Sequence, residues 1–410
     1  MEKTKSFNIG KKLFVQAFKQ VKKNDGTSGI DDVSIEDFED KISSNLYKLW
    51  NRTSSGSYFP PPVLQVKIPK KDGGERKLGI PTVGDRVVQT VVKNILEPDL
   101  EKIFHEDSYG YRPKRSAHMA VEKVSQRCRK KAWVLDLDIK GFFDTIPHDL
   151  MMKAVRAHTD CKWIILLIER WLKASIQLED TSIIERTEGT PQGGSISPLL
   201  ANLFLHYAFD DWMSRNYGYI QFARYADDIV CHCSSRKQAV WLQARLEERF
   251  KQVGLTIHPD KTKIAYCKNG DRKDPYPRIS FDFLGFTFKP RKCMNRKTKK
   301  IYLGFTPAIS KESKKSIKSK IKDWALKRLI AYDFFSLSAK FNKIIHGWIN
   351  YYGKFGIHEM SDIWQYLHDR MASWIRNKYK KVRSSIIRTY NYIKVMKKAN
   401  PNLFAHWRLC

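Results

Sequence analysis

The segment QFARYADDIVCHC, residues 221–233, constrains the fold of this chain more than any other. It is apolar or aromatic almost throughout and is typical of two β-strands joined by a tight turn, yet Asp227 and Asp228 interrupt it. Neighbouring carboxylates repel each other and lose hydration when protein surrounds them. A fold that contains this hairpin must therefore supply positive charge at the turn.

A second acidic group lies in LDLDIKGFFDTIPH, with Asp136 and Asp138 at strand spacing and Asp144 further on. Alternation along a strand places Asp136 and Asp138 on one face. If Asp138 lies across the sheet from Asp227 and Asp228, three carboxylates converge, and hard oxygen ligands of this kind suit Mg²⁺. Two such ions would activate a 3′-hydroxyl and stabilise departing pyrophosphate. The alternative is local hydrogen bonding, because exposed turns also favour Asp.

The charge of the chain points to a polyanionic partner. Lys and Arg number 75 against 43 Asp and Glu, a formal net charge of +32, and a field of this size most often serves nucleic acid. From Lys289 to Cys410 there are 29 basic and 6 acidic residues, so the preceding 288 residues carry only +9. We therefore expect the binding surface in the C-terminal third, the alternative being a generally basic solvated surface.

Several classes of protein are disfavoured. Seven scattered cysteines without a C-x-x-C pair argue against a zinc ribbon, an HNH-type nuclease module and a disulfide framework. No run of eighteen apolar residues indicates a membrane span, and the N-terminus does not resemble a secretory signal. An intracellular protein with no membrane partner is expected.

The pattern along the chain predicts an α+β domain followed by helices. Residues 11–50 indicate two amphipathic helices, 64–81 a hairpin, 133–139 a strand, and 197–215 a helix before the Asp227 hairpin. Residues 267–300 form the best domain boundary, and basic amphipathic helices with embedded aromatic residues follow.

Further blocks occur in a fixed order: KIPKKDGGERKLGIPTVGDRVVQ (67–89), SYGYRPKRSAHMA (108–120), GTPQGGSISPLLANLFLH (189–206), LTIHPDKTKI (255–264) and FDFLGFTF (281–288). With DLDIKGFFDTIPHD and RYADDI, they resemble the sequence blocks of reverse transcriptases. The resemblance is greatest to bacterial group II intron reverse transcriptase/maturases of the compact type without a C-terminal HNH endonuclease domain, and runs from about residue 13 to the C-terminus.

The resemblance implies an α+β right-hand polymerase, with fingers and palm (antiparallel sheet plus helices) followed by an all-α thumb/maturase domain. Its expected parts are an N-terminal extension and fingers (1–130), a palm with part of the fingers (131–290), a thumb/maturase domain X (291–380) and a basic nucleic-acid-binding segment (381–410). HGWINYYGKFG (346–356) is similar to the maturase thumb. We expect more than half of its region's aromatic residues to be buried: Trp324, Trp348, Tyr351, Tyr352 and Trp374.

The resemblance also implies a catalytic metal site. Asp138, Asp227 and Asp228 match the carboxylates that hold two Mg²⁺ ions, with Mn²⁺ as an alternative and the Ile139 carbonyl as a further ligand. Asp136 is then a neighbour of the site, and Asp144 a turn or helix-capping residue.

Residues matching the family's nucleotide-binding positions come from four blocks. Lys70 and Arg76 match the residues that clamp the triphosphate, with Lys71 as the candidate if the register is shifted by one. Phe143 matches the ring under the sugar that excludes a 2′-hydroxyl, and Phe142 is expected in the core. The remaining matches are Gln192 beside the sugar and base, Pro191 and Gly193 shaping its turn, and Lys261 as a proton donor to pyrophosphate.

The resemblance further implies contacts to template and primer. Arg112 would contact the template strand or brace the fingers, and Tyr225 and Ala226 would touch the primer end. The expected activity is RNA-directed DNA polymerisation from a primer 3′-hydroxyl with deoxynucleoside triphosphates. The expected role is intron splicing and retrohoming, in a cytoplasmic protein associated with the nucleoid or an RNA–protein complex.

Alternatives to this role remain open at the sequence level. They are a non-polymerising maturase that only binds intron RNA, and a domesticated reverse transcriptase in defence or repair. The expected partners are group II intron RNA as template, a DNA primer or target, and deoxynucleotides, for a monomer or a homodimer.

Overall fold

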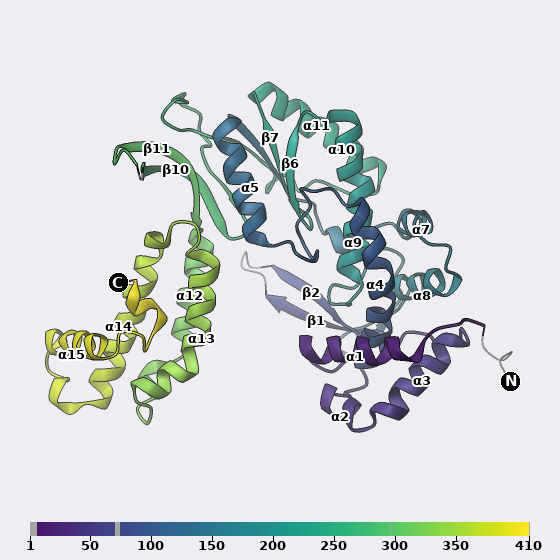
Figure 1. The fold of residues 1–410 in the computed structure, drawn as a ribbon, viewed down its shortest axis with the longest axis horizontal. Helices are drawn as coiled ribbons and strands as arrows, with labels where there is room; N and C mark the ends of the chain where they lie inside the picture. The colour runs from purple at the N-terminus through teal and green to yellow at the C-terminus, as the bar shows by residue number, and fades with distance from the viewer. Residues whose placement is uncertain (1–5, 70–73, 296, 410) are drawn as a thin grey trace. The chain divides into compact units, whose positions relative to one another are not determined.

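The computed structural model describes residues 6–69, 74–295 and 297–409 (Figure 1). The chain forms two compact units. Unit 1 contains residues 1–120 and 135–264, and unit 2 contains residues 121–134 and 265–410. Across the described residues, no helix combines the length and the apolar character that a membrane span requires.

The N-terminal part of unit 1 is helical. It contains α1 (Lys11–Asn24), α2 (Ile35–Asp40), α3 (Ile42–Ser54) and α4 (Val83–Ile103). Helix α1 buries Phe14, Phe18 and Val21, whose spacing places them on one stripe of the helix, and packs against α4. Helix α2 begins with a capping box in which Ser34 and Asp37 each accept a hydrogen bond from the other's backbone N–H.

A four-stranded sheet follows, in the order β2-β1-β4-β5. Strands β1 (Val63–Pro69) and β2 (Glu75–Ile80) are antiparallel, which confirms the hairpin predicted over residues 64–81. The short strand β4 (Ile176–Gln177) runs parallel to β1 and pairs with β5 (Ile183–Ile184).

A second sheet has the order β6-β7-β3-β8. Its strands are β3 (Trp133–Leu137), β6 (Gln221–Tyr225), β7 (Asp228–Cys233) and β8 (Lys263–Tyr266). Around it lie α6 (Phe142–Thr145), α7 (His148–Arg156), α8 (Lys162–Leu172), α9 (Ser197–Leu205), α10 (Asp211–Tyr217) and α11 (Arg236–Gln252). The single helix predicted over residues 197–215 is interrupted by a π-helical turn, η1 (His206–Asp210).

Unit 2 begins with most of α5 (Ala117–Lys130) and continues with a sheet in the order β11-β10-β9. Strands β9 (Phe281–Phe283), β10 (Phe286–Met294) and β11 (Ile301–Ile309) precede α12 (Lys311–Asp323), η2 (Leu326–Arg328), α13 (Phe334–Tyr352) and η3 (Ile357–Met360). The unit ends with α14 (Ser361–Lys378), η4 (Lys380–Val382), α15 (Ile386–Ala399) and η5 (Ala405–Arg408).

The helical core of unit 2 is rich in aromatic side chains. Trp364, Trp374 and Trp407 are among its largest fully or almost fully buried residues. The expectation that more than half of the five selected aromatic residues are buried is wrong, because Trp374 alone among them is buried and the other four are half-buried. The Trp324 ring stacks between Phe341 and Trp348, at centroid distances of 4.3 and 5.5 Å, so these rings pack together at the edge of the core.

Candidate active site

The two adjacent carboxylates lie on the turn between β6 and β7, where Tyr225 pairs directly with Asp228. Ala226 adopts a left-handed backbone conformation with φ of 55°, which a tight hairpin turn of this kind requires. The backbone of Gly110 lies against this turn so closely that a Cβ there would collide with the Ala226 nitrogen. Gly110 therefore packs directly against the turn, and any larger residue at this position would force the backbone of the turn to move.

A buried ion pair supports the turn from inside the unit. The guanidinium of Arg224 donates to the Asp210 carboxylate over 2.8 and 2.5 Å, and both side chains are fully buried. Nη1 of Arg224 also donates to Asn202 Oδ1 at 2.9 Å and to the Ala226 carbonyl at 3.1 Å. The amide of Asn202 in turn donates to the Gly110 carbonyl at 2.7 Å. This network holds both sides of the turn.

The carboxylates of the turn are destabilised by one another and by Asp138. Burial, followed by repulsion from Asp227 and then Asp138, raises the pKa of Asp228 to about 7. Burial raises the pKa of Asp227 as well, with a further contribution from Asp138. Part of the Asp228 side chain is nevertheless exposed to solvent. Asp138 therefore acts electrostatically on both carboxylates of the turn.

Asp138 follows the end of β3, beside the segment that precedes β8. Its carbonyl accepts a hydrogen bond from the His258 N–H at 2.8 Å, and the Lys140 N–H donates to the Thr256 carbonyl at 2.8 Å. Backbone groups alternate between the two edges of a strand, so the N–H and carbonyl of Ile139 point toward the opposite edge. That edge faces β7 in the sheet order, so the Ile139 carbonyl points toward the β7 side of the sheet.

The oxygen ligands available in the described part of the chain are of the type that Mg²⁺ prefers, but they do not form a complete coordination shell. Among the residues that the structure describes, no three His, Cys, Asp or Glu side chains are already placed to hold a metal ion. Carboxylate oxygens and a backbone carbonyl are nonetheless the ligands that Mg²⁺ prefers, and this ion usually completes its coordination with water and substrate phosphates. The raised pKa values mark a group that a cation would stabilise.

Two cationic side chains act on the same carboxylates. Arg76, on β2 opposite Ile68, lowers the pKa of both Asp227 and Asp228 against the effect of burial, and Lys261 does so for Asp228. Both cations are exposed, so they are accessible to a ligand. The structure thus brings Arg76 and Lys261 to the acidic turn, while Lys70 and Lys71 lie outside the described residues.

The predicted sugar-side residues also lie together. The Gly79 N–H of β2 donates to the Gln192 carbonyl at 2.9 Å, and the Thr190 N–H donates to the Phe143 carbonyl at 2.7 Å. Gly193 has φ of 139°, and a Cβ there would collide with the Gly79 carbonyl. The 190–193 turn thus crosses β2 at Gly79. Pro191 is buried beneath this crossing, where its ring would touch a Cβ added at Gly79.

The neighbouring phenylalanines differ in burial, and Phe142 lies in the core as expected. Phe142 is 2% exposed and packs edge-on against Phe143, with ring centroids 5.3 Å apart. The side chain of Phe143 is half-buried, so one part of its ring remains accessible. Asp144 is exposed and Asp136 is half-buried.

Arg112 is held inside unit 1 by several side-chain contacts. Its side chain is buried and makes a forked ion pair with Glu101 at distances of 2.9 to 3.1 Å. It also donates to the carbonyls of His105 at 2.7 Å and Ser108 at 2.8 Å. Tyr225 is half-buried and can present its ring, whereas Ala226 is 6% exposed and offers mainly backbone.

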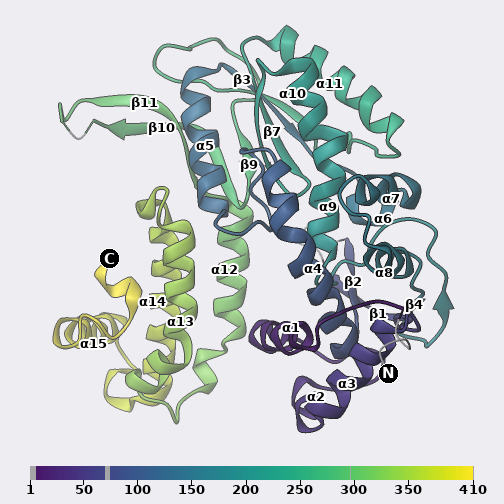
Figure 2. The same ribbon diagram turned by 45° about the vertical axis from the view of Figure 1, so that its right-hand side comes forward.

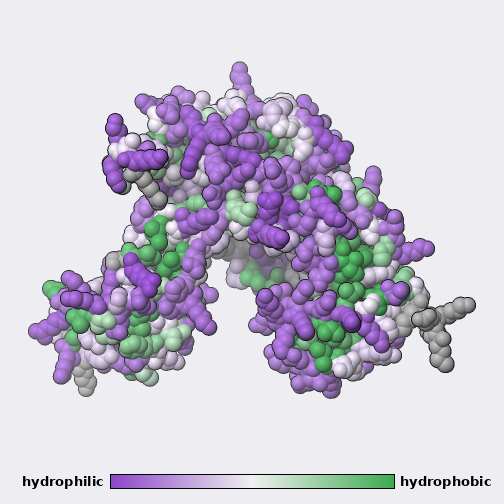
Figure 3. All heavy atoms as spheres, in the orientation of Figure 1, coloured by the Kyte–Doolittle hydropathy of each residue, from purple (hydrophilic) through white to green (hydrophobic). Residues whose placement is uncertain are grey.

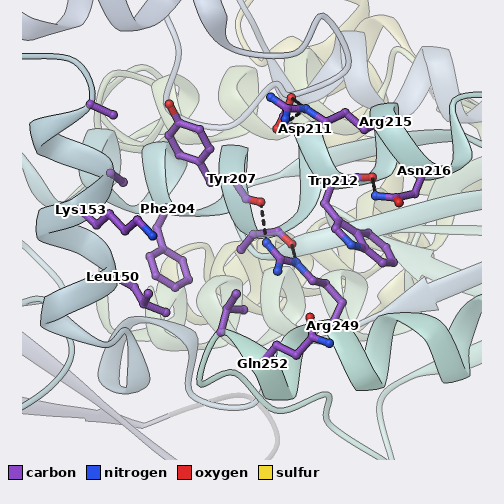
Figure 4. A pocket seen from close by; sticks show the side chains of 14 residues that line it. Leu150, Lys153, Phe204, Tyr207, Asp211, Trp212, Arg215, Asn216, Arg249 and Gln252 are labelled. Carbon is purple, nitrogen blue, oxygen red and sulfur yellow. Dashed lines mark hydrogen bonds and ion pairs between the residues drawn. The ribbon is translucent and has the colours of Figure 1, made fainter.

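Sequence reasoning missed the residues that support the site: Arg224, Asp210 and Asn202. One signal was present, since Arg224 is a lone guanidinium inside a strand whose neighbours are mostly apolar. A cavity of about 510 Å³ also went unpredicted; it lies between α7, η1, α10 and α11 in unit 1 (Figure 4). There Arg249 donates to the Tyr207 and Ala208 carbonyls, and none of the predicted site residues lines the cavity.

An enzyme that joins nucleotides needs carboxylates for metal ions next to cations for a triphosphate, and unit 1 presents both on an α+β framework. Fold and site together define a nucleic-acid polymerase of the right-hand class. More specifically, the chain belongs to the family described as reverse transcriptase (RNA-dependent DNA polymerase), which matches residues 68–288. Residues 314–391 match the group II intron, maturase-specific domain.

Several curated proteins are similar to this chain. Protein YkfC of Escherichia coli is 32% identical over an alignment of 285 residues, and the match covers 60% of this chain and 74% of YkfC. The group II intron-encoded protein LtrA of Lactococcus lactis is 36% identical over 198 residues, 47% of this chain and 32% of LtrA. The chain thus spans only about a third of the length of LtrA. A solved structure of apo telomerase from Candida tropicalis is a distant match, with a TM-score of 0.44 at 12% identity over 58% of this chain and 54% of that one.

Proposed function

We propose that this chain extends the 3′-hydroxyl of a primer with deoxynucleoside triphosphates on an RNA template, at a Mg²⁺ site formed by Asp138, Asp227 and Asp228. One observation carries the proposal. Burial, followed by the charges of Asp227 and Asp138, raises the pKa of Asp228 to about 7, and cations placed among these carboxylates would stabilise their ionised forms.

Each neighbouring residue has a role that its position supports. Arg76 binds the triphosphate, because its guanidinium is exposed beside the acidic turn. Phe143 presents its ring to the sugar and excludes a 2′-hydroxyl. Gln192, held at the crossing with β2, orients the sugar and base. Lys261 donates a proton to the departing pyrophosphate. The bound Mg²⁺ supplies charge neutralisation of the phosphates and activation of the hydroxyl.

The maturase-specific domain supports group II intron RNA as a partner, and with it a role in splicing and retrohoming by a cytoplasmic RNA–protein complex. Helix α12 carries lysines at one-turn spacing along one face, which lines a recess of about 490 Å³: Lys311, Lys314, Lys315, Lys318 and Lys322. Tyr366 of α14 completes this recess and offers a ring for stacking. A row of ammonium groups beside an aromatic ring suits an RNA backbone and its bases.

A non-polymerising maturase is the second candidate, because RNA binding and polymerisation rest on different residues. An RNA-binding domain needs no carboxylate cluster, whereas this chain retains all three carboxylates with Arg76 and Gln192 beside them. A domesticated reverse transcriptase would retain the same site and differ only in its RNA partner.

Primer extension on an RNA template with deoxynucleotides and Mg²⁺ tests the proposal. We expect the unmodified chain to extend the primer, and Asp227→Asn and Asp228→Asn each to lower the rate by about 100-fold or more, because each removes charge needed at the reacting phosphate. Asp160→Asn, at an exposed aspartate outside the site, is the matched control and should leave the rate unchanged. Failure of the unmodified chain to extend several primers, with tight RNA binding retained, would support the non-polymerising maturase instead.

A further inference from the structure

The strands β10 and β11 of unit 2 form a long two-stranded ribbon whose distal half is strongly basic. Residues 289–300 contain seven Lys or Arg, and no acidic residue occurs between Asp282 and Glu312. In both ribbon views, the end of the ribbon extends beyond α12 and α13 (Figures 1 and 2). Its surface is coloured mainly hydrophilic in the space-filling view (Figure 3). Nearer the middle of the ribbon, Lys292 and Met294 line a recess of about 670 Å³ with Arg129 of α5. Neither the polymerase site nor the maturase-specific domain at 314–391 includes this ribbon end.

Large apolar side chains stand among these cations. Met294 and Ile301 are cross-strand neighbours on one face of the ribbon, and they are 59% and 73% exposed. Tyr302, on the other face opposite Cys293, is 52% exposed. Lysines alone could serve to prevent edge-to-edge strand pairing. That role does not account for an exposed Met–Ile pair and Tyr, which would be stabilised by contact with a partner.

Contacts in the middle of the ribbon join it to η3 and to the loop that precedes β9 within unit 2. Arg291 pairs with Glu359 of η3 at 3.0 Å and donates to the carbonyls of Thr287 and Thr306 on the two strands. The Gly270 N–H donates to the Leu303 carbonyl at 2.9 Å, which binds the preceding loop to β11. Near the tip, Asn295 Oδ1 accepts a hydrogen bond from the Lys297 N–H at 2.9 Å.

We propose that this ribbon end is a duplex-DNA-binding element, which enters the major groove with the Met294–Ile301 face toward the bases. The major groove of B-form DNA is about 12 Å wide and admits a two-stranded β-ribbon. Lys292, Lys297, Lys299 and Lys300 then lie near the phosphates that border the groove. The apolar pair contacts base edges and thymine methyl groups. An A-form RNA duplex has a deep and narrow major groove that side chains cannot read, so the geometry favours DNA.

Duplex binding by the ribbon does not depend on polymerase activity, so it can be measured by itself. The test measures fluorescence anisotropy of a labelled DNA duplex, and of an RNA duplex of the same sequence, at several salt concentrations and without nucleotides. The charge variant replaces Lys292, Lys297, Lys299 and Lys300 with Gln. Its matched control replaces four exposed lysines of α1 and α11 with Gln: Lys19, Lys23, Lys237 and Lys251.

On the DNA duplex we expect the charge variant to bind at least about 10-fold more weakly than the control variant at 0.1 M salt. The slope of log affinity against log salt should fall by about 0.9 for each phosphate that the variant no longer neutralises. A second variant, Met294→Ser with Ile301→Thr, should weaken DNA binding without changing that slope. Both should keep the circular dichroism and thermal unfolding of the unmodified chain, because these side chains are exposed.

Three results would overturn the proposal. Equal DNA affinity for the charge variant and its control would show that the ribbon does not meet the duplex. An equal or greater loss on the RNA duplex would assign the ribbon to RNA. Unchanged DNA affinity for the Met294–Ile301 variant would remove the groove contact.

Discussion

Replacing Arg224 with Met should show how much the buried Arg224–Asp210 pair stabilises the acidic turn. The guanidinium makes four hydrogen bonds, two to Asp210 and one each to Asn202 and the Ala226 carbonyl, all in a fully buried setting. Arg224→Met keeps the length and apolar contacts of the side chain and removes its charge and donors. The Asp210 carboxylate then remains buried without the guanidinium.

The magnitude depends on which groups are left unsatisfied. Breaking a buried ion pair by removing one partner destabilises a protein by about 3–5 kcal/mol. Adding Asp210→Leu removes the unpaired charge, so the double variant should recover much of that loss. Asn202 Oδ1 and the Ala226 carbonyl still lack the Arg224 donor in it, at about 1 kcal/mol each. We therefore expect about 2 kcal/mol of destabilisation to remain in the double variant.

Amide hydrogen exchange of peptides from β6 and β7 measures this locally, because it reports the free energy of opening for those strands. Primer extension is measured in parallel. We expect both variants to lose extension, since neither retains the donor to Ala226, although only the single variant opens easily. A change below about 1 kcal/mol in the single variant would refute the reasoning, as would a double variant destabilised by the sum of the two single changes.

Burial among aromatic rings lowers the pKa of His406 well below its usual value, so the stability that it contributes is present above pH 6.5 and is lost as the pH falls. His406→Phe should therefore flatten the loss of unit 2 stability between pH 7.5 and 5 in thermal unfolding. An unchanged pH profile would refute this. Burial raises the pKa of Asp85 to about 6, so its contribution to the stability of unit 1 is complete below pH 3.8 and is lost as the pH rises through 6. Asp85→Asn should abolish that loss of stability in urea unfolding monitored for unit 1. An unaltered pH dependence would contradict this expectation. Gly193→Ala should slow primer extension at least about 10-fold, because strain of about 1–3 kcal/mol shifts the Gln192 turn. Gly347→Ala, where a Cβ meets nothing within 4 Å, should leave the rate unchanged. Equal rates for the two variants would contradict the importance of the close contact between Gly193 and Gly79.

The acidic turn was predictable because its signal is local. Asp227 and Asp228 conflict with the apolar strands around them, and that conflict needs no knowledge of the fold. The separation of Phe142 from Phe143 was predictable for the same reason, since adjacent residues point in different directions. The β1–β2 hairpin was predictable from the Asp-Gly-Gly sequence between two strand-like segments.

Other features depend on partners distant in the sequence. Arg112 is buried against Glu101 on α4, and this contact becomes visible only once both elements are placed. The Arg224–Asp210 pair spans 14 residues and two elements, so no spacing rule reveals it. The exposure of the unit 2 aromatics is likewise set by how far each helix turns from the core. An amphipathic pattern fixes the side of a helix but not the depth of each ring.

The π-helical turn η1 has a consequence for how this chain can vary over evolution. Such a turn holds one residue more than an α-helix in the same stretch, and Asp210 is its last residue. Deleting one residue of 206–209 would let α9 continue into α10 as regular α-helix over the same stretch, because the turn accommodates its extra residue locally. Asp210 would then keep the position from which it meets Arg224, and only the side chains within 206–209 would change direction. Homologues that keep the buried pair can therefore differ by one residue in the length of this segment.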